Sequence, residues 1–191
     1  MKKLLKQIYV GDIFTQKYNF ELGWKREKGH IYGEVTREGA ETIIKKLKDL
    51  KLFNDVYFLD IGCGNGKLVL HFGLYKEVKI SEGVEIFKSK TDYGNDLLRK
   101  LSDYPNSNKI KIECSDILLK ENVHDFNFIF WNNITWDDET NKAVVRKIKK
   151  GSYVITTSSN KSINLKLVDF FDVLYSWNKK GPGKCYIYEK I

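Results

Sequence analysis

The sequence predicts an α/β protein built on one mostly parallel, doubly wound sheet, and three features indicate this fold class. Short apolar runs alternate with stretches of helical periodicity along most of the chain. One of these runs leads directly into a glycine-rich turn at residues 60–66. The last two runs are joined by Gly181-Pro182-Gly183, which is typical of a hairpin turn. We therefore expect a seven-stranded sheet that ends in an antiparallel hairpin.

The expected elements follow one another along the chain. Residues 1–36 show no clear periodicity and are expected to form a short N-terminal lobe. A helix is expected at 37–52, because Ile43, Ile44 and Leu47 share one helical face. The later helices are expected at about 67–75, 86–103 and 137–150. The strands are expected at about 56–61, 79–85, 109–114, 126–131, 153–157, 170–177 and 185–191.

Length and composition exclude several classes of protein. The 191 residues fit one domain, and no apolar run reaches the roughly 18 residues of a membrane span. The N-terminus lacks the apolar stretch of a signal peptide, so we expect a soluble, intracellular protein. Cys63, Cys114 and Cys185 are odd in number and widely spaced, and no CxxC pair accompanies the histidines. We expect neither disulfides nor a metal site.

The chain is basic, with a formal charge of +8. Such an excess favours a polyanionic partner, because neutralising phosphates releases counterions and dominates affinity for nucleic acid. Lysine carries most of the charge, which fits attraction to a phosphate backbone better than bidentate reading of bases. The alternative is that a lysine-rich, asparagine-rich chain reflects the base composition of its genome.

The glycine-rich turn is the clearest sign of a ligand site. A predicted strand ends at Asp60 and leads into Gly62-x-Gly64-x-Gly66, where small residues let the backbone bend sharply and approach a ligand. This GxGxG spacing differs from the GxGxxG of dinucleotide-binding proteins. The difference, together with the terminal hairpin, favours S-adenosylmethionine over a nicotinamide cofactor.

Two acidic residues follow the next two strands. Glu85 ends the second strand, where a carboxylate suits two adjacent ribose hydroxyls, and Asp116 follows the third strand, where it could accept from an adenine amino group. The carboxyl ends of parallel strands line one crevice in open α/β sheets. The alternative is that these residues are solvated loop acids. The pattern predicts a Rossmann-like class I methyltransferase fold.

The loop after the fourth strand, residues 130–136, is expected to meet the methyl acceptor. Enzymes that methylate exocyclic amines of nucleobases commonly carry an Asn/Asp-Pro-Pro-aromatic tetrad there. The only prolines of this chain are Pro105 and Pro182, so the tetrad is absent.

Several motifs, in order, resemble the Dot-type (disruptor of telomeric silencing) histone lysine methyltransferases, which use a Rossmann-like domain and not a SET domain. They are Tyr32-Gly33-Glu34-Val35-Thr36, Asp60–Lys67, Gly83-Val84-Glu85, Asn132-Asn133, Ser176-Trp177 and Tyr186. The resemblance implies a catalytic domain at 37–191, preceded by a lobe and a cofactor-covering loop at 1–36. It implies cofactor binding by Tyr32, Glu34, Thr36, Asp60, Gly62, Gly64, Gly66, Lys67, Glu85, Asp116, Ile117 and Asn132. It implies catalytic roles for Asn132, Trp136, Trp177 and Tyr186, which would form a lysine channel.

The chain departs from the family pattern near this channel. The family's Asn-Asn-Phe-Ala-Phe becomes Asn-Asn-Ile-Thr-Trp at 132–136, and Ile117 replaces the aromatic residue expected to stack on adenine. Either Cys185 or Tyr186 occupies the family's first tyrosine position. The target lysine is therefore less well defined than the cofactor site.

The resemblance also implies a mechanism and a partner. Transfer of a methyl group to a lysine amine is a direct displacement that requires alignment but no metal. We expect no dedicated general base; His30 is the one nearby candidate. The partner would be a nucleosomal histone, H3 or H4, in the nucleus, with possible contacts to DNA phosphates and no membrane. Basic residues expected to bind the nucleosome are Lys25, Arg26, Lys28, Lys179 and Lys180.

Other functions remain open on the sequence alone. The same cofactor site would serve a methyltransferase acting on RNA or a small molecule. The chain could instead be a catalytically poor S-adenosylmethionine-binding module that interacts with chromatin. The sequence does not determine which histone and lysine are modified, how many methyl groups are added, or the oligomeric state.

Overall fold

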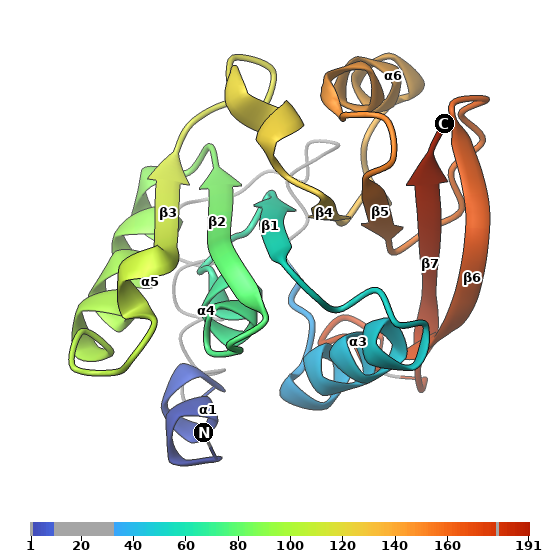
Figure 1. Ribbon diagram of the computed structural model, residues 1–191. Coiled ribbons are helices and arrows are strands. Elements are labelled where there is room, and N and C mark those ends of the chain that lie inside the picture. Colours follow the sequence, from blue (N-terminus) through green and yellow to red (C-terminus); the bar gives the residue numbers. More distant parts are fainter. Residues whose placement is uncertain (1, 10–32, 179) are drawn as a thin grey trace.

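The structure, a computed structural model, describes residues 2–9, 33–178 and 180–191 and contains one mixed sheet between two layers of helices (Figure 1). The helices are α1 (Lys2–Tyr9), α3 (Arg37–Asp49), α4 (Lys67–Gly73), α5 (Lys88–Lys100) and α6 (Asp138–Lys147), with short 3-10 turns η1 (Ser107–Lys109) and η2 (Asn122–Asp125). The strands are β1 (Val56–Ile61), β2 (Val78–Glu85), β3 (Ile110–Cys114), β4 (Phe128–Trp131), β5 (Tyr153–Thr156), β6 (Leu165–Val173) and β7 (Gly183–Lys190).

The sheet has seven strands in the order β3-β2-β1-β4-β5-β7-β6. The pairs β1–β2, β1–β4, β2–β3 and β4–β5 are parallel. Strand β7 lies antiparallel between β5 and β6. The predicted fold is therefore confirmed: a mostly parallel seven-stranded sheet that ends in an antiparallel hairpin. Because β1 lies between β2 and β4, the ends of those two strands flank the turn that follows it.

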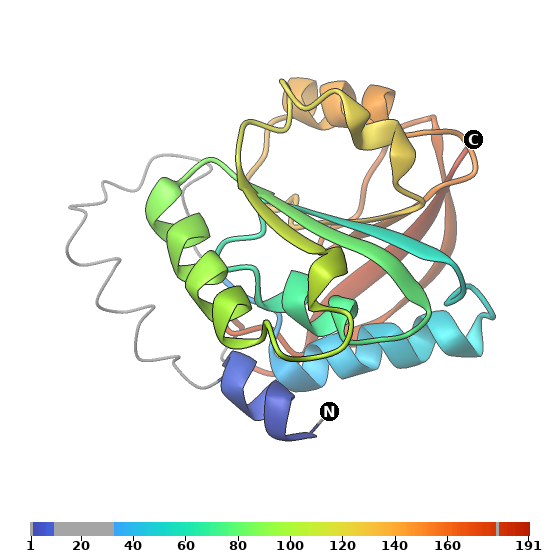
Figure 2. The same ribbon diagram turned by 60° about the vertical axis from the view of Figure 1, so that its left-hand side comes forward.

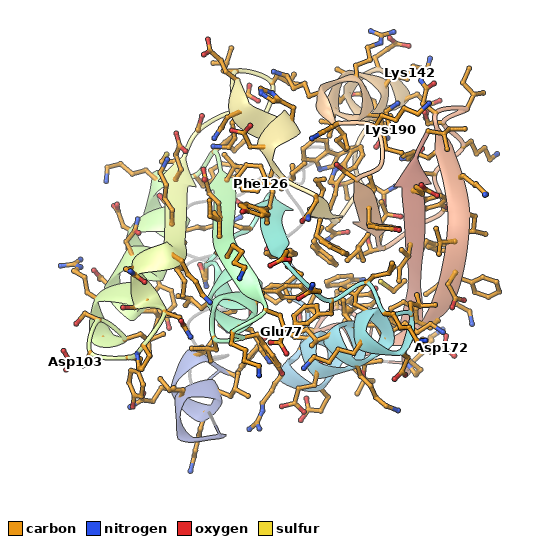
Figure 3. The ribbon with its side chains drawn as sticks, viewed as in Figure 1. Glu77, Asp103, Phe126, Lys142, Asp172 and Lys190 are labelled. Atoms are coloured by element: carbon orange, nitrogen blue, oxygen red, sulfur yellow. The ribbon has the colours of Figure 1, made fainter. Side chains whose placement is uncertain are left out.

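Helices cover both faces of the sheet (Figure 2). Alternate side chains of β1 point to opposite faces, so Phe58 packs beneath α3 and α4 while Leu59 packs beneath α6 and η2. Helices α1 and α5 extend the first layer next to α4. Figure 3 shows Lys142, on α6, near the top of the view and Glu77, just before β2, in its lower half. No helix in the described ranges is long and apolar enough to cross a membrane.

The first helix was missed in the sequence. Leu4, Leu5 and Ile8 of α1 are buried in the cluster formed with α4 and α5, and the Tyr9 hydroxyl lies 3.0 Å from His71 Nδ1. Three apolar residues in eight are too few to establish a helical period, which explains the omission. Residues 10–32 of the expected N-terminal lobe lie outside the described residues.

The hairpin lies earlier in the chain than expected. Its first strand was placed at 170–177, but β6 spans Leu165–Val173 and residues 174–177 leave the sheet. Those residues pair instead with the segment before α3, through a bridge between Val35 and Tyr175. Apolar residues continue through both environments, so the pattern alone could not locate the end of the strand.

Candidate functional site

The glycine-rich turn joins the end of β1 to the start of α4. The backbone N–H groups of Gly62 and Cys63 both donate to the Val84 carbonyl, at 2.9 and 3.0 Å, which bends the chain across the end of β2. Gly62 and Gly66 adopt φ angles of 72° and 70°, a region that favours glycine. A Cβ at Gly66 would overlap Ile112 of β3, whereas a Cβ at Gly62 would meet open space. The turn is thus packed against β3 at Gly66 and is open at Gly62.

Backbone hydrogen bonds hold the Glu85 side chain beside this turn. Its carboxylate accepts hydrogen bonds from the backbone N–H groups of Gly64 at 3.0 Å and Phe87 at 3.1 Å, and the side chain is buried. Asp116, after β3, accepts from the Leu118 N–H at 2.8 Å. These backbone contacts fix both carboxylates at the carboxyl ends of their strands.

A cavity of about 680 Å³ opens over these strand ends. Its lining includes Gly62, Glu85, Asp116, Ile117, Asn132 and Trp136, six of the residues predicted to act in the site. The structure therefore brings the ends of β1, β2, β3 and β4 to one cavity, as the rule for open α/β sheets requires.

Asp60 lies behind the turn and is almost completely buried. Burial, and next the nearby Glu85 carboxylate, raise the pKa of Asp60 to about 8. Burial also raises the pKa of the Cys63 thiol, so that cysteine is a protonated packing group at neutral pH. Asp60 is therefore mostly in its neutral form at neutral pH.

A second, smaller cavity of about 30 Å³ adjoins the first, and Gly33, Gly62 and Asn132 line both. Its other walls include Glu34, Asp60, Lys67 and Trp177. Lys67, the first residue of α4, is buried and its Nζ lies 2.7 Å from Glu34 Oε2. Residues from the two ends of the chain thus meet beside the glycine turn.

The loop after β4 is tied to the end of β5. The Asn132 side chain accepts a hydrogen bond from Thr157 Oγ1 at 2.6 Å, and Asn133 accepts from the backbone N–H and hydroxyl of Ser158, both at 3.0 Å. Trp136 contacts Trp131 edge to face, with ring centroids 5.3 Å apart. Asn132 lies between the two cavities, whereas the buried Asn133 holds the loop.

Other predicted site residues lie elsewhere. Tyr186, on β7, stacks with Phe170 at 6.1 Å and lines neither of these two cavities, and Cys185 is fully buried in the core. Thr36 caps α3, accepting from the Gly39 N–H at 3.0 Å. Lys180 is exposed. Tyr32, Lys25, Arg26, Lys28, Lys179 and His30 lie outside the described residues.

A comparison with protein families adds a finding to this geometry. The family model described as "Histone methylation protein DOT1" matches residues 20–173, most of the chain. The chain belongs to the DOT1 family. No curated protein matches it.

Solved structures similar to this DOT1-family chain share its fold at low sequence identity. Magnesium protoporphyrin IX methyltransferase from Synechocystis PCC 6803, with bound SAM, has a TM-score of 0.63 and 10% identity, and the match covers 100% of this chain and 98% of that one. An RNA methyltransferase from Salinibacter ruber, in complex with S-adenosyl-L-homocysteine, has a TM-score of 0.61 and 10% identity, covering 78% and 91%. A putative RNA methyltransferase from Pyrococcus horikoshii has a TM-score of 0.59 and 13% identity, covering 94% and 99%. The fold is that of class I methyltransferases, and family and fold together make this chain a SAM-dependent methyltransferase of the DOT1 family.

The cavities also contain residues that the sequence did not identify. Phe87 and Lys90 follow β2 and line the larger cavity, and burial lowers the pKa of Lys90. Thr140, in the first turn of α6, lines its opposite side. Phe87 and Lys90 follow an expected strand end, a signal that could have identified them. Thr140 depends on how α6 lies over the sheet, which the sequence of this DOT1-family chain does not reveal.

Proposed function

We propose that this DOT1-family chain transfers a methyl group from S-adenosylmethionine to a lysine of a nucleosomal histone, H3 or H4. One observation carries the proposal: Glu34 and Ser176-Trp177, far apart in sequence, meet at the glycine turn next to Asn132. Glu34 and Ser176-Trp177 belong to motifs that resemble DOT1 proteins specifically, whereas the glycine-rich turn is common to many methyltransferases. Their meeting supports the proposal that Trp177 forms an aromatic wall beside the reacting methyl group.

The cofactor site fits S-adenosylmethionine by its donor chemistry. The proposed contacts are made by Tyr32, Glu34, Thr36, Asp60, Gly62, Gly64, Gly66, Lys67, Glu85, Asp116, Ile117 and Asn132. Gly62 leaves open space where a side chain would stand, and Glu85 keeps a fixed carboxylate at the end of β2, suited to ribose hydroxyls. Asp116 and Ile117 line the cavity where an adenine ring would lie.

The proposed chemistry is a direct displacement. The cofactor supplies an electrophilic methyl group on a sulfonium. Trp136 and Trp177 would remove water from the lysine head and so favour its neutral, nucleophilic form. Asn132 lies between the two cavities and would orient the incoming amine. Tyr186 remains a proposed member of the lysine channel that would act from outside these two cavities.

The experiment that tests this function uses radiolabelled S-adenosylmethionine with separate pools of nucleosomes, free histones, tRNA and DNA. We expect label on a histone lysine, with nucleosomes labelled best. Label on tRNA would replace the proposal with an RNA methyltransferase. Cofactor binding with no label on any pool would indicate a catalytically poor chromatin-binding module.

The proposed nucleosome contacts, which imply a nuclear location, come from basic residues that include Lys25, Arg26, Lys28, Lys179 and Lys180. Neutralising the first three to glutamine should reduce transfer to nucleosomes more than to free histone, because phosphate contacts contribute only on nucleosomes. A matched control changes net charge equally at exposed positions elsewhere: Lys45, Lys76 and Lys100 to glutamine. Equal loss on both substrates would discard these contacts.

A further inference from the structure

The connection between β3 and β4 forms one wall of the larger cavity. Residues 115–127, all of which the structure describes, include the 3-10 turn η2 and no α-helix. Four residues of this connection line the cavity: Ser115, Asp116, Ile117 and Leu118. The Ser115 N–H donates to the Glu85 carbonyl at 3.0 Å, which fixes the start of the connection to the end of β2. Beyond Asp116, the position of the wall depends on side-chain contacts.

Asp116 and Lys120 are the two ends of one tight turn. The Lys120 N–H donates to the carbonyls of Asp116 at 3.2 Å and Ile117 at 3.3 Å. The Leu119 N–H also donates to the Asp116 carbonyl, at 3.0 Å, while the Asp116 carboxylate accepts from the Leu118 N–H at 2.8 Å. A shift of the Lys120 backbone would therefore move Asp116 as well.

The Lys120 side chain is anchored by carboxylates of the sheet. Glu82, on β2, points to the same face as Val84, which packs on the α6 side. Lys120 Nζ lies 2.5 Å from Glu82 Oε1 and 3.2 Å from Glu113 Oε2, on β3. The side chains of Lys120 and Glu82 are 5% and 7% exposed. A buried cation of the loop thus bridges two neighbouring strands.

Burying this ion pair removes two charges from water. A buried ion pair is often no more stabilising than apolar side chains of similar volume, because the lost hydration offsets the attraction. The pair supplies a fixed geometry instead, since Lys120 Nζ has to reach both Glu82 and Glu113. This requirement restricts where the turn that begins at Asp116 can lie.

We infer that Lys120 is a positioning residue, held by Glu82 and Glu113, that sets the Asp116 carboxylate against the adenine end of the cofactor. The inference rests on the proposed function, with Asp116 as the acceptor for the adenine amino group, and adds the residue that fixes this acceptor. Lys120 lines neither of the two cavities, so it acts through the turn. Preference for adenine over other bases thus depends on an ion pair outside the cavity.

The test compares two ligands that differ at one position of the base. S-inosylhomocysteine carries a carbonyl oxygen where S-adenosylhomocysteine has its amino group. In the unmodified protein, calorimetry should give a dissociation constant about tenfold or more higher for S-inosylhomocysteine, because the Asp116 carboxylate would face an oxygen. In Lys120→Met this ratio should drop to less than about threefold, with weaker binding of S-adenosylhomocysteine. General destabilisation would weaken binding of both ligands and leave their ratio unchanged.

An apolar pair of substitutions separates positioning from stability. Lys120→Met with Glu82→Met leaves no unpaired buried charge, so the protein should resist urea at least as well as the unmodified one. Its ratio should still be less than about threefold. The matched control, Lys46→Met with Asp169→Asn, removes a 2.6 Å ion pair between α3 and β6, lines neither cavity and should keep the full ratio.

A third variant tests whether Lys120 acts through Asp116. Asp116→Ala should lower the ratio as far as Lys120→Met does, and combining the two substitutions should lower it no further, since both remove one contact. A further drop in the combined variant would mean that Lys120 acts on the base by another route, which contradicts the inference.

Three other results would overturn the inference. A full ratio in Lys120→Met or in the apolar pair would mean that Asp116 is positioned without the ion pair. A ratio near one in the unmodified protein would mean that Asp116 does not recognise the amino group, although cofactor binding would stand. Failure of the unmodified protein to bind S-adenosylhomocysteine would overturn the proposed function itself.

Discussion

Two regions of the site differ in how the chain builds them. The strand-end region, Gly62, Glu85 and Asp116, follows three neighbouring parallel strands and lines one cavity. The aromatic region, Trp136, Trp177 and Tyr186, is divided between the two faces of the sheet: Trp177 packs on the α3 side, and Trp136 and Tyr186 on the α6 side. The order of the parallel strands is enough to bring the residues of the strand-end region together. The arrangement of the aromatic region depends instead on the path of the loops at the end of the sheet.

The difference also concerns rigidity. Glu85 is buried and accepts from two backbone N–H groups, and Asp116, just beyond β3, accepts from one in its own loop, so local backbone contacts orient both carboxylates. Trp177 instead packs against the backbone at Gly33, which belongs to a segment far away in the sequence. Variants should therefore act on ligand binding in the strand-end region and on transfer in the aromatic region.

The largest effect should come from filling the open space above the turn. Gly62→Arg places a long side chain in the larger cavity, so S-adenosylhomocysteine binding by calorimetry should be abolished. The matched control is Gly151→Arg, because Gly151 also has a positive φ, 83°, and open space for a Cβ, but lines neither cavity. Equal loss of binding in both variants would mean that backbone strain, and not occupation of the cavity, is responsible.

The next effect concerns the buried carboxyl group of Asp60. Its folded pKa of about 8 lies above the ordinary value of 3.8, so between those values the folded protein binds a proton that the unfolded chain releases. The free energy of unfolding should therefore fall as pH rises, by on the order of 1 kcal/mol per pH unit, until Asp60 is ionised. Asp60→Asn has no carboxyl group to ionise and does not lose this stability. The difference in Tm between the variant and the unmodified protein should therefore increase with pH up to about pH 8 and then become constant.

The comparison of Asp60→Asn with the unmodified protein cancels the contribution of other groups. Burial lowers the pKa of His71 to about 3, which has the opposite effect, raising stability as pH increases toward its ordinary value of 6.5. Asp103→Asn, at an exposed position that Figure 3 labels, is the matched control for the loss of one carboxyl group. A Tm difference independent of pH for Asp60→Asn would contradict a raised pKa.

A smaller effect separates the two parts of the aromatic region. Trp177→Ala should lower kcat for histone methylation about tenfold, with S-adenosylhomocysteine affinity nearly unchanged, because it removes one wall of the smaller cavity. Tyr186→Ala should lower kcat less, since Tyr186 lines neither of the two cavities. If Tyr186→Ala is as damaging as Trp177→Ala, the lysine channel includes the outer part of β7.

The same contrast explains which parts of the molecule could be predicted. Gly62, Glu85 and Asp116 each follow a strand, and parallel strands bring such positions together whatever the helices do. Trp177 lines the smaller cavity and its catalytic role stays a prediction, but its contact with Gly33 joins residues 144 positions apart, and no local pattern specifies such a contact. Thr36 was assigned to the cofactor, yet its hydroxyl caps α3, a competing use that the sequence pattern equally allows. Helix α1 was missed because a short helix carries too little periodicity.

The smallest effect should leave both regions intact. Tyr9→Phe removes the single hydrogen bond between α1 and His71 while preserving the ring that packs beside α4. The free energy of unfolding should fall by about 1 kcal/mol, the net value of one such bond in a protein interior, as measured by urea denaturation. Affinity for S-adenosylhomocysteine should stay the same, because neither residue lines either of the two cavities. A large loss of affinity would instead mean that α1, and not only the strand ends and loops, helps to shape the site.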